Sequence, residues 1–108
     1  MSKIKNIILN SLQLKNGKVV YDDLNINPAL SFAQQKWSFK EDMLQIDFNN
    51  KYLIDVGWYP EFQENGAFLV IVIKDFDWEN SLFEKRCQDL GTLKKYLQEA
   101  IDLVSCIH

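Results

Sequence analysis

The sequence has few of the residues that most often carry enzyme chemistry. Its one histidine is the last of its 108 residues, and its two cysteines, Cys87 and Cys106, form no Cys-x-x-Cys motif. These three side chains cannot supply a four-ligand zinc site. The chain also lacks a Gly-x-Ser-x-Gly elbow and a glycine-rich phosphate loop. We therefore expect a protein that is not an enzyme and that uses no metal and no cofactor.

Long apolar runs and flexible segments are scarce as well. No stretch approaches the roughly 18 apolar residues of a membrane-spanning helix, and the run from Ile4 to Leu9 lacks a full signal-peptide core and cleavage site. Four Gly and two Pro leave little room for linkers, while seven Phe, four Tyr and three Trp argue against disorder. We expect one domain over residues 1–108, cytoplasmic, with reduced thiols and no membrane contact.

Positive charge is in the minority. Fifteen acids against twelve Lys and Arg give a net charge of −3, whereas a nucleic-acid-binding protein normally has a basic face. The acids concentrate in residues 21–64, which hold eight acids and three Lys. This distribution predicts that the partner is a basic protein and not a nucleic acid.

Alternation of apolar and polar residues predicts a sheet. Residues 43–48 and 52–59 both alternate and should pair as an antiparallel hairpin across the turn at residues 49–51. Residues 67–73 are apolar on both faces, which predicts a central strand that is covered on both sides. Residues 82–88 can form a fourth strand.

The two ends of the chain complete the predicted fold. A helix should begin after Thr92 as N-cap and bury an apolar stripe, which consists of Leu93, Leu97, Ala100, Ile101 and Val104. Residues 3–12 have helical spacing, and residues 19–21 form a possible short strand. This N-terminal segment, helical or irregular, should cover the other face or an edge. The fold class is therefore α+β, an antiparallel β-meander of about four strands with a C-terminal helix packed on one face.

Two segments combine aromatic residues with acids, a composition typical of protein-binding surfaces. They span residues 58–64 and residues 75–79, so they flank the strand of residues 67–73 and should lie at its opposite ends. The candidate partner-binding residues are Tyr59, Glu61, Glu64, Asp75, Asp77, Trp78 and Glu79.

Plainer interpretations stay open for some of these residues. The acids could be ordinary solvated charges. Trp58 shares the face of Ile54 and is more consistent with the core, whereas Trp78 is equally consistent with the core and with an interface. Asp55 and Glu61 are a carboxylate pair that could in principle act on a glycoside, although two acids near a turn are usually surface residues.

Parts of the sequence resemble a known family. They are Phe39–Ile46, reading FKEDMLQI, and Ile54–Pro60, reading IDVGWYP, followed by Gly66–Ile73 and Asp77-Trp78. Over residues 39–104 the chain resembles small bacterial immunity proteins encoded beside polymorphic toxins, including those of contact-dependent growth inhibition systems. The resemblance implies a cytosolic antidote that binds a cognate toxin domain, often a nuclease, and occludes its active site.

The acidic composition agrees with this function. Many nuclease domains are basic, and an acidic inhibitor would be steered onto them by charge. Two alternatives remain, a small non-catalytic adaptor or chaperone-like protein-binding domain and, less favoured, a carboxylate-based hydrolase. The upstream reading frame separates the immunity function from the adaptor, because an immunity gene directly follows its toxin gene.

Overall fold

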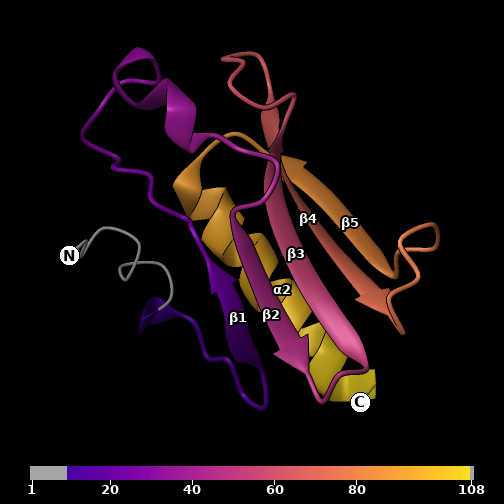
Figure 1. Ribbon diagram of the computed structural model, residues 1–108. Helices are drawn as coiled ribbons and strands as arrows, with labels where there is room; N and C mark the ends of the chain where they lie inside the picture. The colour runs from indigo at the N-terminus through magenta and orange to yellow at the C-terminus, as the bar shows by residue number, and fades with distance from the viewer. Residues whose placement is uncertain (1–9, 108) are drawn as a thin grey trace.

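The computed structural model describes residues 10–107, which form a five-stranded antiparallel sheet with a long helix across one face (Figure 1). Each strand pairs with the next one along the chain, so the sheet is a meander in the order β1-β2-β3-β4-β5. The elements are β1 (Lys18–Asp22), the 3-10 helix η1 (Ala33–Ser38), β2 (Leu44–Phe48), β3 (Tyr52–Tyr59), β4 (Ala67–Lys74), β5 (Phe83–Cys87) and α2 (Leu90–Ile107).

The predicted α+β class and meander are confirmed, but the sheet has five strands where the sequence predicts about four. The additional strand is β1, which lies along the outer edge of β2, with a bulge between Val19 and Tyr21. Because β1 is an exposed edge strand with a bulge, its apolar alternation is too irregular to mark it clearly as a strand. Most of the helix predicted over residues 3–12 lies outside the described residues.

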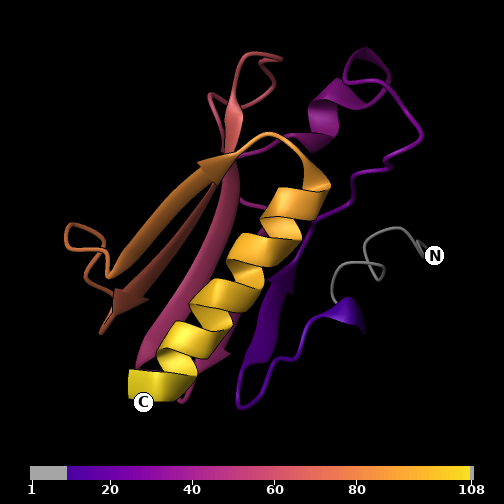
Figure 2. The same cartoon turned by 180° about the vertical axis from the view of Figure 1, so that it is seen from behind.

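The core lies between the sheet and α2 (Figures 1 and 2). Alternate residues of the three central strands point toward the helix and are buried, including Ile46, Val56 and Val70. The predicted stripe of α2 faces them, and all five of its members are fully buried: Leu93, Leu97, Ala100, Ile101 and Val104. The hydrophobic pattern of the helix is therefore what orients it on the sheet.

The cap of α2 differs from the prediction. The helix begins at Leu90, and Thr92 lies inside its first turn. The Asp89 carboxylate accepts hydrogen bonds from the Thr92 amide at 2.8 Å and from Thr92 Oγ1 at 3.0 Å, so Asp89 caps the helix. These bonds also lower the pKa of Asp89, because they stabilise its ionised form.

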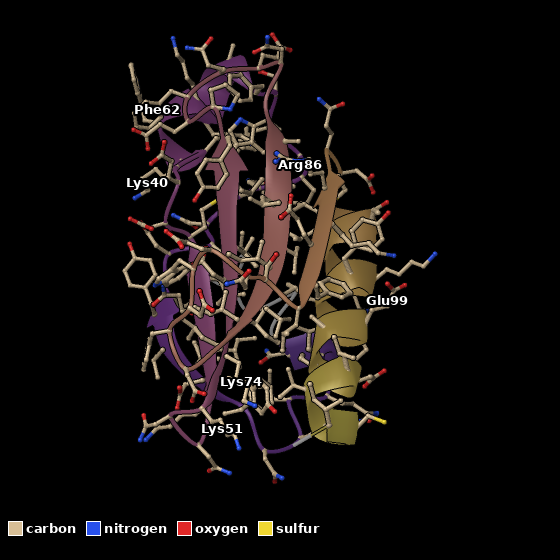
Figure 3. The ribbon with its side chains drawn as sticks, turned by 90° about the vertical axis from the view of Figure 1, so that its right-hand side faces the viewer. Lys40, Lys51, Phe62, Lys74, Arg86 and Glu99 are labelled. Atoms are coloured by element: carbon tan, nitrogen blue, oxygen red, sulfur yellow. The ribbon has the colours of Figure 1, made fainter. Side chains whose placement is uncertain are left out.

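The second face of the sheet, which we call the open face, is not covered by any of the described helices (Figure 3). The prediction that the central strand is covered on both sides holds for only part of its length, because on the open face Ile73 is fully buried while its neighbours on that face are not. On β4, Leu69 and Ile71 point away from α2 and are only half-buried. The sequence is misleading here because an apolar side chain on an open face gives the same pattern as a buried one.

Candidate partner-binding surfaces

The chain between β4 and β5, residues 75–82, is fixed at both of its ends. The Asp75 amide donates a hydrogen bond to the Lys51 carbonyl oxygen at 2.7 Å, and the Leu82 amide donates one to the Val72 carbonyl oxygen at 2.7 Å. Figure 3 shows this connection turning toward the open face, on the side of the sheet away from α2. We call it the 75–82 connection.

A carboxylate holds the middle of the 75–82 connection. Asp77 accepts a hydrogen bond from the Glu79 amide at 3.2 Å and one from Asn80 Nδ2 at 2.9 Å. This side chain therefore has a local structural role in addition to any contact with a partner. The connection has a defined shape, and the side chains that it carries are presented on a fixed backbone.

Three large apolar side chains of this connection are exposed to solvent. The exposed fractions are 61% for Phe76, 51% for Trp78 and 46% for Leu82. Trp78, which the sequence assigns equally to core and interface, is thus at the surface. Exposed apolar side chains that are rimmed by polar residues are a feature of protein interaction sites, and these three lie within one short connection.

The acids around these apolar side chains are not neutralised by the residues that the structure describes. Asp75 and Glu79 form no ion pair with any residue from 10 to 107. The nearest base in sequence is Lys74, the last residue of β4. The 75–82 connection therefore combines aromatic side chains with unpaired negative charge, the composition that would suit a basic protein partner.

The other predicted residues lie at the opposite end of β4. Tyr59 closes β3, and its hydroxyl donates to the Glu41 carbonyl oxygen at 3.2 Å. Glu61 Oε1 accepts a hydrogen bond from the Glu41 amide at 3.2 Å. Both side chains therefore tie the segment before β2 to the end of the sheet. With a rise of about 3.3 Å per residue, the eight residues of β4 separate the two clusters by about 23 Å.

Negative charge surrounds Tyr59. Burial, followed by the nearby carboxylates of Asp55 and Glu41, raises the pKa of the Tyr59 phenol. Asp42 and Glu61 add to the same effect. The end of the open face near Tyr59 is therefore acidic. Asp55, Glu41 and Asp42 contribute to this charge, although the sequence does not single them out as partner-binding residues.

Asp55 is the one buried acid in the described part of the chain. It lies on the open face of β3, is 5% exposed, and accepts a hydrogen bond from Gln45 Nε2 at 2.9 Å. Burial raises its pKa, and the bond from Gln45 partly offsets that effect. Alternation along β3 predicts the direction of the Asp55 side chain but not its burial, which depends on neighbouring strands.

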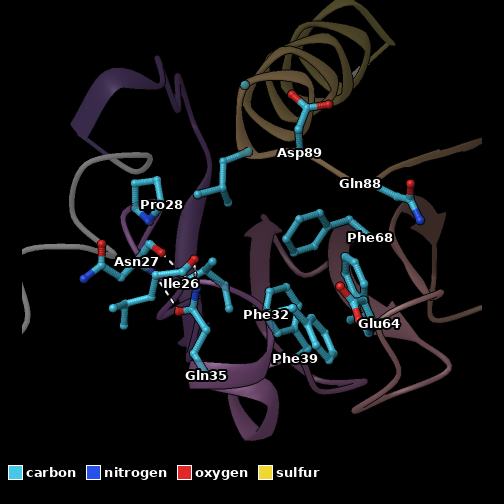
Figure 4. A pocket seen from close by; sticks show the side chains of 14 residues that line it. Ile26, Asn27, Pro28, Phe32, Gln35, Phe39, Glu64, Phe68, Gln88 and Asp89 are labelled. Atoms are coloured by element: carbon cyan, nitrogen blue, oxygen red, sulfur yellow. Dashed lines mark hydrogen bonds between the residues drawn. The ribbon is translucent and has the colours of Figure 1, made fainter.

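Glu64, the last residue of the first cluster, borders a cleft of about 530 Å³ (Figure 4). Aromatic side chains from two parts of the chain line this cleft, Phe32 and Phe39 from the segment around η1 and Phe68 from β4. Asp89 lies on its rim at the start of α2. The cleft has no signature in the sequence, because no local pattern brings these segments together.

Trp58 belongs to the aromatic wall of the cleft and to the core, in agreement with the core interpretation. It is 3% exposed, and its indole Nε1 donates to the Gln63 carbonyl oxygen at 2.7 Å. Its ring packs edge-on against Phe39 and Phe68, with centroids 4.6 Å and 4.9 Å apart. This residue therefore stabilises the end of the sheet and gives the cleft a rigid wall.

Within residues 10–107, no group of three or more His, Cys, Asp or Glu side chains could hold a metal ion, and no helix there has the length and apolar character needed to cross a membrane. No protein-family model, curated protein or solved structure matches this chain.

Proposed function

We propose that this protein is an immunity protein that binds a basic toxin domain and blocks it by occlusion, without chemistry of its own. The observation that carries the proposal is the 75–82 connection, where exposed Phe76 and Trp78 stand beside the unpaired acids Asp75 and Glu79. Aromatic side chains supply most of the binding energy of typical interfaces, and surrounding charges raise the association rate.

Backbone conformation supports a role in binding for Phe76. This residue has a φ of 58°, in the left-handed region where a bulky side chain costs roughly 1–2 kcal/mol. Its side chain is largely exposed, so packing within the protein does not recover that cost. A residue that is unfavourable for the free protein is expected where a partner makes use of it.

The carboxylates give less support to a hydrolase. Asp55 is buried and bound to Gln45, which leaves it poorly placed to reach a substrate together with Glu61. In the cleft, the carboxylate of Asp89 caps α2, and its pKa is lowered rather than raised as an acid catalyst requires. We therefore propose that the acids serve recognition.

The test begins with capture of the partner. The tagged protein is expressed with the product of the adjacent upstream reading frame, and the complex is isolated. Association and dissociation rates are then measured at low and high salt. The informative variant combines Asp75→Lys with Glu79→Lys and leaves Asp77 intact, because the Asp77 carboxylate holds the connection together. A control with the same charge change combines Glu99→Lys with Asp102→Lys on α2, and its thermal unfolding is measured alongside because these carboxylates pair with Lys85 and Lys15.

We expect the double reversal at residues 75 and 79 to slow association by about tenfold at low salt and to flatten its salt dependence. Trp78→Ala should weaken the complex by about tenfold or more, mainly through faster dissociation. Cells that produce the toxin should lose protection in parallel. If both variants bind and protect as the parent does, while the α2 control weakens binding, the proposal is wrong.

A further inference from the structure

The cleft beside Glu64 has walls that are already in place without a ligand. Phe39, Trp58 and Phe68 are almost fully buried, and their rings are locked against one another by edge-on contacts. Ile26 closes the opposite side and is buried as well. Figure 4 shows Phe32, Phe39 and Phe68 gathered around the cleft, with the start of α2 above them. Its volume of about 530 Å³ lies within the range of small-ligand sites, roughly 300–1,000 Å³.

Most polar groups of the lining are already used within the protein. Gln35 Nε2 donates to the Asn27 carbonyl oxygen at 2.8 Å, and Gln88 Nε2 donates to the Gly66 carbonyl oxygen at 2.8 Å. These amides shape the rim and offer little further hydrogen bonding to a ligand. A ligand would therefore meet a mainly apolar surface inside the cleft.

Among the described residues, the charge of the lining has one sign only. Glu64 and Asp89 are the two ionisable side chains that residues 10–107 contribute to it, and this part of the chain contributes no Lys or Arg. The Glu64 carboxylate makes no hydrogen bond or ion pair with residues 10–107. An anionic ligand would be repelled at the rim, whereas a cationic group beside an apolar body would be attracted.

We propose that this cleft receives an apolar, preferably aromatic, side chain that stands next to a lysine or arginine on the basic partner. The apolar side chain fills the cleft beside Phe32 and Leu90, over the edges of the packed rings, and the neighbouring cation pairs with Glu64. This inference rests on the proposed function, because it assumes that the partner is a basic protein. It adds a second contact, at the end of β4 opposite the 75–82 connection.

The test uses short peptides instead of the partner. The ¹⁵N-labelled protein is titrated with N-acetyl-phenylalanyl-arginine amide, and amide and indole resonances are followed by NMR. The indole N–H of Trp58 is a reporter inside the cleft wall. Two further peptides separate the two features of the ligand: N-acetyl-phenylalanyl-glutamate amide reverses the charge, and N-acetyl-glycyl-arginine amide removes the aromatic ring.

We expect the first peptide to bind with a dissociation constant of about 1 mM, and the other two to bind at least about fivefold more weakly. Shifts should centre on Trp58, Phe68 and Leu90. Glu64→Gln should weaken the first peptide by about two- to fivefold and reduce the salt dependence of its binding, since Asp89 stays on the rim. Glu79→Gln, a matched loss of one acid on the 75–82 connection, should leave the affinity unchanged.

Several results would overturn the inference. The glutamate peptide could bind as well as the arginine peptide, the glycyl peptide could bind as well as both, or no resonance near the cleft could shift at about 10 mM peptide. If the resonances near the cleft shift with protein concentration and not with peptide concentration, the occupant is a second copy of this chain. Because the peptide titration does not involve the partner, its failure leaves the charge-reversal test at residues 75 and 79 intact.

The captured complex links the two proposals. Partner binding should displace the arginine peptide from the cleft, and Glu64→Gln should speed dissociation of the complex by about two- to fivefold. If the peptide binds but the partner does not displace it, the partner does not use the cleft. If the reversals at residues 75 and 79 have no effect on the complex, the proposed function fails whatever the peptide does.

Discussion

Both faces of the sheet carry large apolar side chains, but the helix α2 covers only one of the two faces. On β4, Val70 and Val72 point toward α2 and are completely buried, whereas Leu69 and Ile71 point the other way and remain half-exposed. All four are large apolar side chains of one strand. The helix therefore buries Val70 and Val72, whereas the open face is covered only in part, at the end of β4 where Ile73 is fully buried.

This difference separates stability from recognition. The covered face joins the sheet to α2 in one apolar cluster and should supply most of the free energy of folding. The open face adds polar and acidic groups to its apolar side chains, and the 75–82 connection turns toward it. Changes on the covered face should alter the stability of the free protein, whereas changes on the open side should mainly alter partner binding.

The largest expected effect comes from the covered face. Leu97→Ala removes a fully buried side chain of α2 and should lower the free energy of unfolding by about 2–5 kcal/mol. Ile71→Ala is its counterpart on the open face and should cost only about 1 kcal/mol, because a half-buried side chain leaves no enclosed cavity. Urea unfolding of both variants measures the difference. Equal losses would show that the open face is packed as tightly as the core.

A second prediction concerns the part of the open face that the segment before β2 covers. Gly57 lies on β3 beneath the segment that precedes β2, and a Cβ at this position would collide with the Glu41 carbonyl group. Gly57→Ala should therefore lower the free energy of unfolding by about 1–3 kcal/mol. Gly91→Ala is the control, because its Cβ meets only the end of the Asp89 side chain, at 3.3 Å, in the first turn of α2. It should be neutral or slightly stabilising.

Most residues of the covered face can be predicted from the sequence, because their burial follows the local spacing of apolar residues along each helix and strand. The stripe of α2 and the alternation along β2 and β3 identify both the elements and their core-facing residues. Trp58 follows the same alternation, which is why the core interpretation is confirmed. The edge strand β1 is harder to predict, since a bulge shifts its register between Val19 and Tyr21.

The candidate partner-binding surfaces are harder to predict from the sequence than the core is. Strand order predicts that the two acidic clusters lie at opposite ends of β4, and this is how the structure places them. The hydrogen bonds of Asp77, the burial of Asp55 and the cleft beside Glu64 each depend on groups brought together by tertiary folding. Periodicity carries no information about such contacts.

A third prediction compares two turns at the same end of the sheet. Asn49 and Asn50 both have a φ of 58°, and Asp75 and Phe76 have φ values of 55° and 58°. Asn tolerates this left-handed region well, and Phe does not. Phe76→Asn should therefore raise the free energy of unfolding by about 1 kcal/mol while weakening partner binding.

The reciprocal variant is its control. Asn50→Phe should lower the free energy of unfolding by about 1–2 kcal/mol and leave partner binding unchanged. Thermal unfolding and the binding assay are measured on the same preparations. A loss of stability in Phe76→Asn would mean that the Phe76 side chain contributes packing to the free protein, and the argument that it is retained for a partner would not hold.

The smallest expected effect concerns the charge buried on the open face. Burial raises the pKa of Asp55 above its ordinary 3.8, so the folded protein holds this proton more tightly than the unfolded chain does. Ionisation of Asp55 therefore lowers the free energy of unfolding as the pH rises from 3.8 through the raised pKa of the folded protein. Asp55→Asn keeps an oxygen for Gln45 and removes the charge, so the variant should be more stable than the parent at pH 7. That advantage should shrink as the pH falls toward 3.8, and urea unfolding across this range measures it. A stability difference that does not vary with pH would show that the carboxylate is as well solvated in the folded protein as in the unfolded chain.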